Sequence, residues 1–541
     1  MSLLVSMRRS PIAASGLIRR SLAGPLVLAA VSALSVAGLF SRMMNYQLRR
    51  DEELYVPPAR LLDDHHLYAD FFYNHTPGSA WLFHAVRTVV GSNDLLLDGR
   101  VAVFLGWLLF AAAISLFTYR MTGSLFLSWS LTTLTLVNEL LLTQAGMGAT
   151  NNFLPLPFSF IGMALIVVVA TGRGEEQWLL GLAGLSLALA VDIKASAIAF
   201  VIVAGGAVWF LPGRLDVAER LRRHVAPLLA GGVVGGLPVL SYLVVDTRRF
   251  LDNVVGYHLG PHKAYFLSAA SAGEGAATSL MAKALLAHGM LLGNGTAAAA
   301  LVALIVAGLF WRMQSGPGRS LDRGVIWSLV FVFVAFVASS FVALVPTPSF
   351  PQYFAPPLVC VPLALAVLLS ALPATILPQA KMVTLAAAAA VLIGQGPRLM
   401  QDVATFLKPR DWTVFAVHRA GAAMADRLKA KGLDGRVATI APIYPLEGGL
   451  PVYAELATGP FLFRTADLVS PALARSYRMV TPEGVAALFA VEPPAAFLLG
   501  FEPAIEAPLR KFAESHGYRP LANFAIRDRY GVGRLWVRPT P

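Results

Sequence analysis

The stretch Leu22–Phe40, LAGPLVLAAVSALSVAGLF, decides the fold class of this 541-residue chain. It carries no charge, and it is about as long as the ~20 apolar residues that a helix needs to cross the hydrocarbon core of a bilayer. Arg8, Arg9, Arg19 and Arg20 precede it, and no clear A-x-A cleavage site follows. The sequence therefore predicts an uncleaved signal anchor and, with it, an integral membrane protein.

Further apolar runs of spanning length recur along the chain. Hydrophobic residues make up 56% of the sequence and charged residues only 14%, and the mean hydropathy of +0.64 lies outside the range of soluble globular proteins. We expect a polytopic α-helical membrane protein with about eleven transmembrane helices. The predicted runs are 22–42, 99–119, 124–142, 153–171, 178–193, 196–211, 225–245, 294–311, 325–345, 353–372 and 382–397.

The basic residues predict how the chain is oriented. The formal net charge is +12, but Lys and Arg are scattered between apolar runs. This pattern argues against nucleic acid as a partner and favours anionic membrane lipids. If the N-terminus is cytoplasmic, the short loops rich in Lys and Arg are cytoplasmic too, as the positive-inside rule requires. In a plasma or inner membrane, this orientation leaves loops 41–98 and 246–293 and the segment after Pro397 outside.

The segment 398–541 has a different character, with charges restored and helix and strand patterns mixed. We expect it to be an extracytoplasmic (periplasmic) soluble α/β domain, following a transmembrane catalytic domain at 1–397. It contains no G-x-G-x-x-G fingerprint and no Walker loop, and Cys360 is the only cysteine of the chain. The expected helices are Asp411–Lys431 and Glu502–Gly517, and the expected strands are Arg436–Ala441, Ala495–Gly500 and Arg534–Arg538.

The first predicted outer loop holds the densest group of titratable and aromatic residues. Asp51-Glu52-Glu53 follows the first span closely, and residues 68–78 read YADFFYNHTPG. Near a membrane surface a low effective dielectric raises the pKa of a carboxylate and strengthens its attraction for a proton or a cation. This placement suits Asp51 as a general base. The alternative is that these charges only solvate the loop and orient the first helix.

Basic and histidine residues supply complementary groups on the predicted outer side. Lys194 lies between two close spans and Arg100 begins another, and fixed donors of this kind suit a phosphate at the membrane surface. His75 and His258, together with Glu52, are candidate ligands for a divalent metal. No pair of them has the regular helical spacing of a zinc motif, and loop histidines that accept hydrogen bonds are the alternative.

Aromatic residues beside polar groups recur in two further outer segments. Residues 250–258 read FLDNVVGYH, and residues 352–357, which include Tyr353, read QYFAPP. Such groups suit stacking on sugar rings, and they equally suit the aromatic belt of an ordinary membrane protein.

In this order, the segments resemble the polytopic GT-C glycosyltransferases, in particular the protein-mannosyltransferase-like and lipid A aminoarabinose transferase-like branch. The resemblance is carried by Asp51-Glu52, by residues 68–78, by the segment Gly184–Lys194, and by residues 250–258 and 352–357. It implies an inverting hexosyl- or pentosyltransferase of the cell envelope. The sugar donor would be a polyprenyl-phosphate carrier, and the acceptor would be a lipid, a glycan or a protein on the outer face.

The resemblance also implies roles for individual residues. Asp51 would be the catalytic carboxylate, with Glu52 supporting it. In the aminoarabinose branch an arginine lies three residues after the aspartate, where this chain has Leu54, so carrier-phosphate binding must be arranged differently. The implied substrate-binding and carrier-binding residues are Lys194, Arg100, Asp70, His75, Tyr353 and His258.

Two other classes of protein share the composition. A transporter predicts ionisable residues and Gly/Pro breaks at mid-membrane in corresponding positions of two halves. Here the polar groups cluster at the outer ends, and the odd number of spans gives no obvious pair of halves. A non-catalytic lipid-binding protein would require neither Asp51 nor Lys194. The sequence thus favours the transferase.

Overall fold

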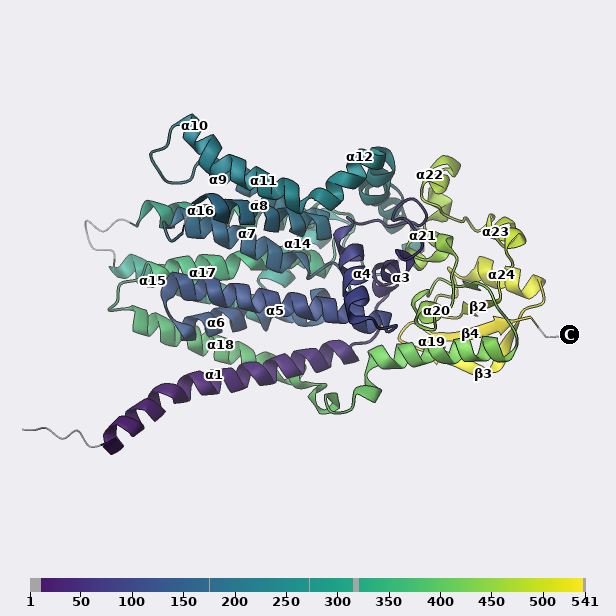
Figure 1. Ribbon diagram of the computed structural model, residues 1–541, viewed down its shortest axis with the longest axis horizontal. Coiled ribbons are helices and arrows are strands. Elements are labelled where there is room, and N and C mark those ends of the chain that lie inside the picture. Colours follow the sequence, from purple (N-terminus) through teal and green to yellow (C-terminus); the bar gives the residue numbers. More distant parts are fainter. Residues whose placement is uncertain (1–10, 175, 272, 315–320, 539–541) are drawn as a thin grey trace, which may run out of the picture.

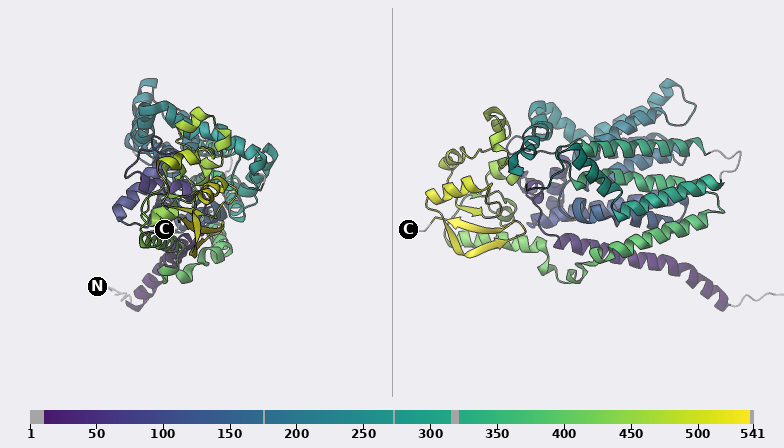
Figure 2. Two further views of the ribbon diagram at one scale, coloured as in Figure 1. Left: turned by 90° about the vertical axis from the view of Figure 1, so that its right-hand side faces the viewer. Right: turned by 180° about the vertical axis from the view of Figure 1, so that it is seen from behind.

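The structure, a computed structural model, describes residues 11–174, 176–271, 273–314 and 321–538. Apolar helices form an elongated bundle, and a smaller region of helices and strands covers one end of it (Figures 1 and 2). Of the predicted N-terminal arginines, Arg8 and Arg9 lie outside the described residues. The predicted class, a polytopic helical membrane fold with strands near the C-terminus, is confirmed.

Each predicted apolar run coincides with helix in the described residues. By length and composition, six helices of this part of the chain can cross a membrane, or seven if one bent pair counts as a span. The other four runs form shorter apolar helices, so length alone does not establish eleven crossings. The helices are α1 (Pro11–Asn45), α5 (Leu95–Thr122), α6 (Leu125–Leu136), α7 (Pro155–Ala170), α8 (Glu176–Ile193), α9 (Ile198–Trp209), α11 (Ala226–Gly235), α12 (Leu237–Leu251), α15 (Gly295–Gln314), α16 (Arg323–Leu344), α17 (Cys360–Ser370) and α18 (Leu377–Met400).

The run predicted at 225–245 is not one straight span. The chain bends by 67° between α11 and the helical segment that begins with α12. The break falls at Gly236, just before Pro238, which has no N–H for the helical ladder. Before the break, α11 packs closely against α8, and a Cβ on Gly231 would lie only 1.8 Å from the carbonyl oxygen of Gly181. Glycine is therefore required for this backbone contact.

The two loops predicted to lie outside contain short helices. The first loop holds α2 (Glu52–Tyr55), α3 (Pro58–Leu61) and α4 (Gly78–Val90), and the second holds α13 (Lys263–Leu267) and α14 (Leu280–Leu291). Both loops lie at the end of the bundle that the C-terminal region covers (Figure 1). The three parts predicted to share one side of the membrane therefore share one end of the structure.

The C-terminal region contains a four-stranded sheet in the order β1-β2-β4-β3. The strands β1 and β2 are parallel, and the other pairs are antiparallel. Its interior includes Phe497, Leu509 and Trp536. The bounds are α19 (Thr413–Ala430), β1 (Val437–Ala438), α20 (Ile443–Glu447), α21 (Pro460–Phe463), α22 (Pro471–Ser476), α23 (Val485–Val491), β2 (Ala496–Leu499), α24 (Ala507–Ser515), β3 (Arg519–Arg527) and β4 (Val532–Val537), with α10 (Val217–Arg220) at the far end of the bundle.

Most of the predicted C-terminal elements are present. The helix expected from Glu502 begins instead at Ala507, because the preceding residues form a turn in which Glu506 accepts hydrogen bonds from the N–H groups of Gly500 and Phe501. Strand β3 was not predicted. Most of its side chains are exposed or half-exposed, and its pairing with β4 is irregular, so it lacks the alternating apolar pattern of a half-buried strand.

Polar contacts fasten the C-terminal region to the bundle end. The carboxylate of Glu53 accepts a hydrogen bond from Ile443 N–H at 3.0 Å, and that of Glu447 accepts one from Leu96 N–H at 2.8 Å. Thr413 donates to the carbonyl oxygen of Asn45 at 2.8 Å. The C-terminal region is thus held directly over the first outer loop.

Candidate functional site

A cavity of about 880 Å³ lies where the two outer loops, the segment before α17 and the C-terminal region meet. Residues that are far apart in the sequence line it together. Five of the predicted site residues are among them: Asp51, His75, Lys194, His258 and Tyr353.

Asp51 directly precedes α2 and is half-buried. Its side chain does not cap that helix, and the described residues give its carboxylate no hydrogen-bond or ion-pair partner. A carboxylate that lines a cavity without a partner remains free to accept a proton from a ligand.

Lys194 lies between α8 and α9 in an extended backbone conformation. Its Nζ donates to Asn152 Oδ1 at 2.5 Å and lies 5.1 Å from the centre of the Tyr353 ring. Burial lowers the pKa of Lys194 to about 8, and the nearby Asp51 charge opposes that shift. The direct partners of the ammonium are thus uncharged, and the ammonium faces the cavity. It can therefore bind the negative charge of a phosphate there.

Two neutral imidazoles line the cavity near these groups. The Tyr55 hydroxyl donates to Asn151 at 2.8 Å and lies 2.6 Å from His75 Nε2, so that nitrogen carries the proton and donates to Tyr55. His258 Nε2 donates to a backbone carbonyl oxygen, that of Asn74, at 2.8 Å. Burial lowers the pKa of both histidines, and their ring centres lie 5.4 Å apart. Both therefore present an unprotonated Nδ1 as an acceptor.

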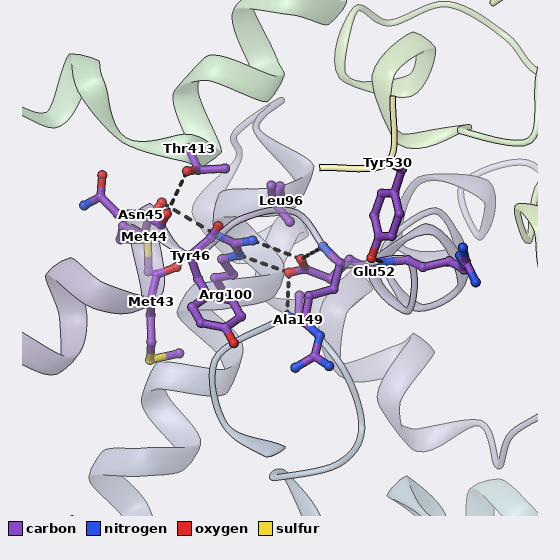
Figure 3. A network of polar contacts seen from close by, with 12 residues as sticks. Met43, Met44, Asn45, Tyr46, Glu52, Leu96, Arg100, Ala149, Thr413 and Tyr530 are labelled. Carbon is purple, nitrogen blue, oxygen red and sulfur yellow. Dashed lines mark hydrogen bonds and ion pairs between the residues drawn. The ribbon is translucent and has the colours of Figure 1, made fainter. Parts of the chain in front are cut away.

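Glu52 and Arg100, by contrast, form a fully buried ion pair beneath the loop (Figure 3). Arg100 donates to both carboxylate oxygens of Glu52 at 3.0 and 2.9 Å, and to the carbonyl oxygens of Met43 and Tyr46. Glu52 also accepts from Ala149 N–H at 2.7 Å. Neither side chain lines the cavity. The structure therefore does not place Glu52 beside the Asp51 carboxylate, or Arg100 with Lys194.

The separation of the two neighbouring carboxylates follows from helix geometry. Successive residues point about 100° apart around a helix, so at the start of α2 one side chain faces the cavity and the next faces the core. Glu52 accepts hydrogen bonds from Arg49 N–H in the segment after α1, from Arg100 of α5 and from Ala149 N–H, and these contacts position the loop that carries Asp51.

Asp70 also lies away from the other predicted residues. Its carboxylate accepts hydrogen bonds from the backbone and ring nitrogens of His66, at 2.7 and 3.1 Å, on the surface of the first loop. The backbone hydrogen bond lowers the pKa of Asp70. Because it does not line the cavity, its predicted role in substrate binding has no support in this geometry.

The predicted metal set is not assembled, because Glu52 is enclosed with Arg100. Among the described residues, the one group of three side chains with possible metal-ligand atoms close together is Asp94, His418 and Glu447. There His418 Nδ1 lies 2.7 and 2.9 Å from the two carboxylates, which are ordinary hydrogen-bond distances. This group joins the C-terminal region to the start of α5, away from the cavity lining.

The arrangement of helices matches solved membrane glycosyltransferases. ArnT from Cupriavidus metallidurans in the apo state aligns with a TM-score of 0.62 at 12% identity, covering 97% of this chain and 98% of that one. The chain has the GT-C fold. ArnT bound to undecaprenyl phosphate gives a TM-score of 0.55 at 13% identity, over 95% and 98% of the two chains.

A third similar GT-C structure is larger. The arabinofuranosyltransferase AftD from Mycobacteria aligns with a TM-score of 0.51 at 14% identity, over 95% of this chain but 40% of that one. No family model matches the sequence, and no curated protein matches it. At these identities the likeness establishes the fold.

The sequence analysis missed the cavity residues of the C-terminal region and Glu274 of the second loop. The C-terminal region contributes Phe461, Arg464, Arg529 and Tyr530. None belongs to a recognisable motif, and only their basic and aromatic character was visible beforehand. In the second loop, Lys263 belongs to the outer-side cations expected to suit a phosphate, whereas Glu274 was not anticipated.

Proposed function

We propose that this chain is an inverting membrane glycosyltransferase that takes its sugar from a polyprenyl-phosphate donor. One observation carries the proposal. The unpaired carboxylate of Asp51 and the ammonium of Lys194, which lacks a close anionic partner, line the same large cavity at one end of a GT-C-type helical bundle. The acceptor would be a lipid, a glycan or a protein.

The two groups suit the two halves of the transfer reaction. Asp51 would accept a proton from the acceptor nucleophile as its oxygen attacks the anomeric carbon. The bond from that carbon to the carrier phosphate breaks, and the phosphate leaves with the bonding electrons. A phosphate leaving group needs electrostatic stabilisation more than protonation, and Lys194 would supply it.

The solved neighbours support the choice of donor. The ArnT structure from Cupriavidus metallidurans holds undecaprenyl phosphate, and the two folds match over nearly their whole lengths. From this likeness, and from the position of Lys194 in the cavity, we infer that this chain also uses a polyprenyl-phosphate carrier. We also propose that the cavity faces the outside of a plasma or inner membrane, with the N-terminus in the cytoplasm, as the charge pattern predicts.

Replacement of Asp51 tests the reaction directly. Purified protein in lipid vesicles is supplied with a panel of polyprenyl-phosphate hexoses and pentoses together with candidate lipid, glycan and peptide acceptors, and release of the carrier phosphate is measured. We expect Asp51→Asn to lower turnover by roughly 100-fold or more, because general-base catalysis typically contributes that much. The matched control is Asp64→Asn, which alters a 67% exposed carboxylate of the same loop. Near-normal turnover of Asp51→Asn would contradict the proposal.

A further inference from the structure

The C-terminal region places a nearly enclosed arginine in the wall of the cavity. The side chain of Arg464, which follows α21, is only 3% exposed. Its guanidinium lies 4.6, 5.1 and 5.0 Å from the ring centres of Tyr265, Phe266 and Phe461. The buried Nε has no hydrogen-bond partner among the described residues. A buried cation with an unused donor is costly unless an anion joins it.

The anion next to Arg464 is Glu274, from the second outer loop. Glu274 Oε1 lies 3.5 Å from Arg464, and Oε2 lies 3.8 Å from Arg50 of the first loop. The same carboxylate accepts a closer hydrogen bond, at 2.7 Å, from the Tyr265 hydroxyl. Charge-assisted hydrogen bonds are normally about 2.7–2.9 Å long, so Glu274 spans the gap between the two guanidinium groups without contacting either closely.

A tetrahedral oxyanion suits this gap better than a carboxylate does. A phosphate group offers three or more strong acceptor oxygens, and arginine binds phosphate through paired N–H groups. Neither arginine has a well-aligned hydrogen bond at Nε, but Arg50 Nε lies 2.6 Å from the Glu502 carboxylate, whereas Arg464 Nε has no such neighbour among the described residues. Arg464 would therefore gain most from a bound phosphate.

We infer that Arg464 and Arg50 form a second phosphate-binding subsite of the cavity, which Glu274 occupies as an internal ligand in the free protein. An arriving phosphate group displaces the Glu274 carboxylate. Arg50 adjoins Asp51 in the sequence, and Lys194 reaches the cavity from the break between α8 and α9. Asp51 and the residues of both proposed phosphate subsites therefore line one cavity. Only the use of the subsite during transfer rests on the proposed function, and anion binding itself does not.

Two sources could supply the phosphate: a lipid headgroup or free phosphate. The test uses the purified full-length protein in detergent with two probes, inorganic phosphate and phosphatidic acid in mixed micelles, and it measures affinity by calorimetry. Glu274→Gln removes the internal competitor, so phosphate should bind about tenfold more tightly. Arg464→Gln should bind it about tenfold more weakly. Arg475→Gln, an exposed arginine of α22 that does not line the cavity, should bind as the native protein does.

The opposite signs of the two variants are decisive. A purely structural ion pair predicts that both variants lose thermal stability and that neither changes phosphate affinity, and that result would overturn the inference. If Arg464→Gln does not fold, Arg464→Lys keeps the charge and loses the planar fork, and it should bind with intermediate affinity. Tighter binding of phosphatidic acid than of phosphate would assign the subsite to a lipid headgroup, and binding of phosphate alone would assign it to a soluble phosphate.

The outcome is separable from that of the proposed reaction. Lys194→Gln should leave the phosphate response of the Arg464 subsite in place. If Asp51→Asn retains turnover while the Glu274 and Arg464 variants respond as expected, the transfer proposal fails and the subsite stands. If Asp51→Asn abolishes turnover while Glu274→Gln and Arg464→Gln bind phosphate with the native affinity, the subsite fails and the transfer proposal stands.

Discussion

Two cations, Arg100 of α5 and Lys194 between α8 and α9, were given the same role from the sequence, yet their surroundings differ. Arg100 donates to both oxygens of an equally buried carboxylate and to backbone carbonyl oxygens, so its charge is balanced inside the protein. Lys194 donates to a neutral amide and lies beside an aromatic ring at the cavity wall. The first cation is part of the fold, and the second remains able to bind an external anion.

The same contrast separates Glu52 from Asp51. Glu52 is enclosed by donors, and Asp51 has none among the described residues. Internal balance of charge, rather than residue type or depth, therefore distinguishes the structural groups from the candidate functional groups here.

Breaking the balanced pair should have the largest effect on stability. Glu52→Ala leaves Arg100 buried without its counter-charge, which typically costs about 3–5 kcal/mol. We expect this variant to unfold at a clearly lower temperature in detergent, or to fail to accumulate. Asp51→Asn, one residue away, should unfold like the native protein. If Glu52→Ala and Asp51→Asn were equally stable, Glu52 would not have the structural role that distinguishes it here from Asp51.

Removing the unbalanced cation should affect ligand binding instead. Lys194→Met should weaken binding of undecaprenyl phosphate by about 10- to 100-fold, because a hydrogen bond to a charged group contributes roughly 1.5–3 kcal/mol. Its thermal stability should change little, since the buried ammonium has no ion-pair partner to lose. The measurement is titration of the purified variant with the carrier lipid. Unchanged affinity would remove Lys194 from the site.

The pH dependence of carrier binding sharpens this point. Burial lowers the pKa of Lys194 to about 8, so the phosphate-binding ammonium is lost as the pH rises through that value. Carrier affinity should fall above pH 8, by up to about tenfold per pH unit. The carrier phosphate is already fully ionised there, because the second pKa of a phosphate ester lies near 6. In Lys194→Met, affinity should not change over the same range.

The smallest effect on stability is expected at His418, a partly exposed cation whose charge is balanced by two carboxylates. His418 bridges Asp94 and Glu447 with a side chain that is 30% exposed, and the hydrogen bond to Glu447 raises the pKa of His418 above 6.5. A raised pKa stabilises the folded state below pH 6.5, and this contribution is lost as the pH rises through the folded-state value. His418→Gln should lower the free energy of unfolding by less than about 1 kcal/mol at pH 6 and leave it unchanged at pH 9. A large loss at pH 9 would indicate another role.

The sequence predicted the bundle well, since long apolar runs leave the chain few alternatives to helices in a membrane. It could not show that α11 and α12 meet at an angle, because that depends on how α11 packs against α8. It also could not show that Asp51 lines the cavity while Glu52 is enclosed, since both are acidic residues in one loop. Their opposite surroundings depend on Arg100, which is 48 positions away from Glu52 in the chain.

Only part of the cavity lining could be predicted from the sequence. Its membrane-side wall includes Lys194 and Tyr353, which lie next to helices that the apolar runs of the sequence predict. Its other wall includes Arg464 and Tyr530, which reach the site because Glu53, Glu447 and other contacts fasten the C-terminal region to the bundle end. Long-range contacts of this kind leave no local pattern in a sequence.

A structure of the protein with undecaprenyl phosphate bound would test the central claim most directly. The account predicts density for the lipid phosphate within hydrogen-bond distance of Lys194 Nζ, with the Asp51 carboxylate facing it across the cavity. A phosphate bound elsewhere, with Lys194 still bonded only to Asn152, would contradict the account.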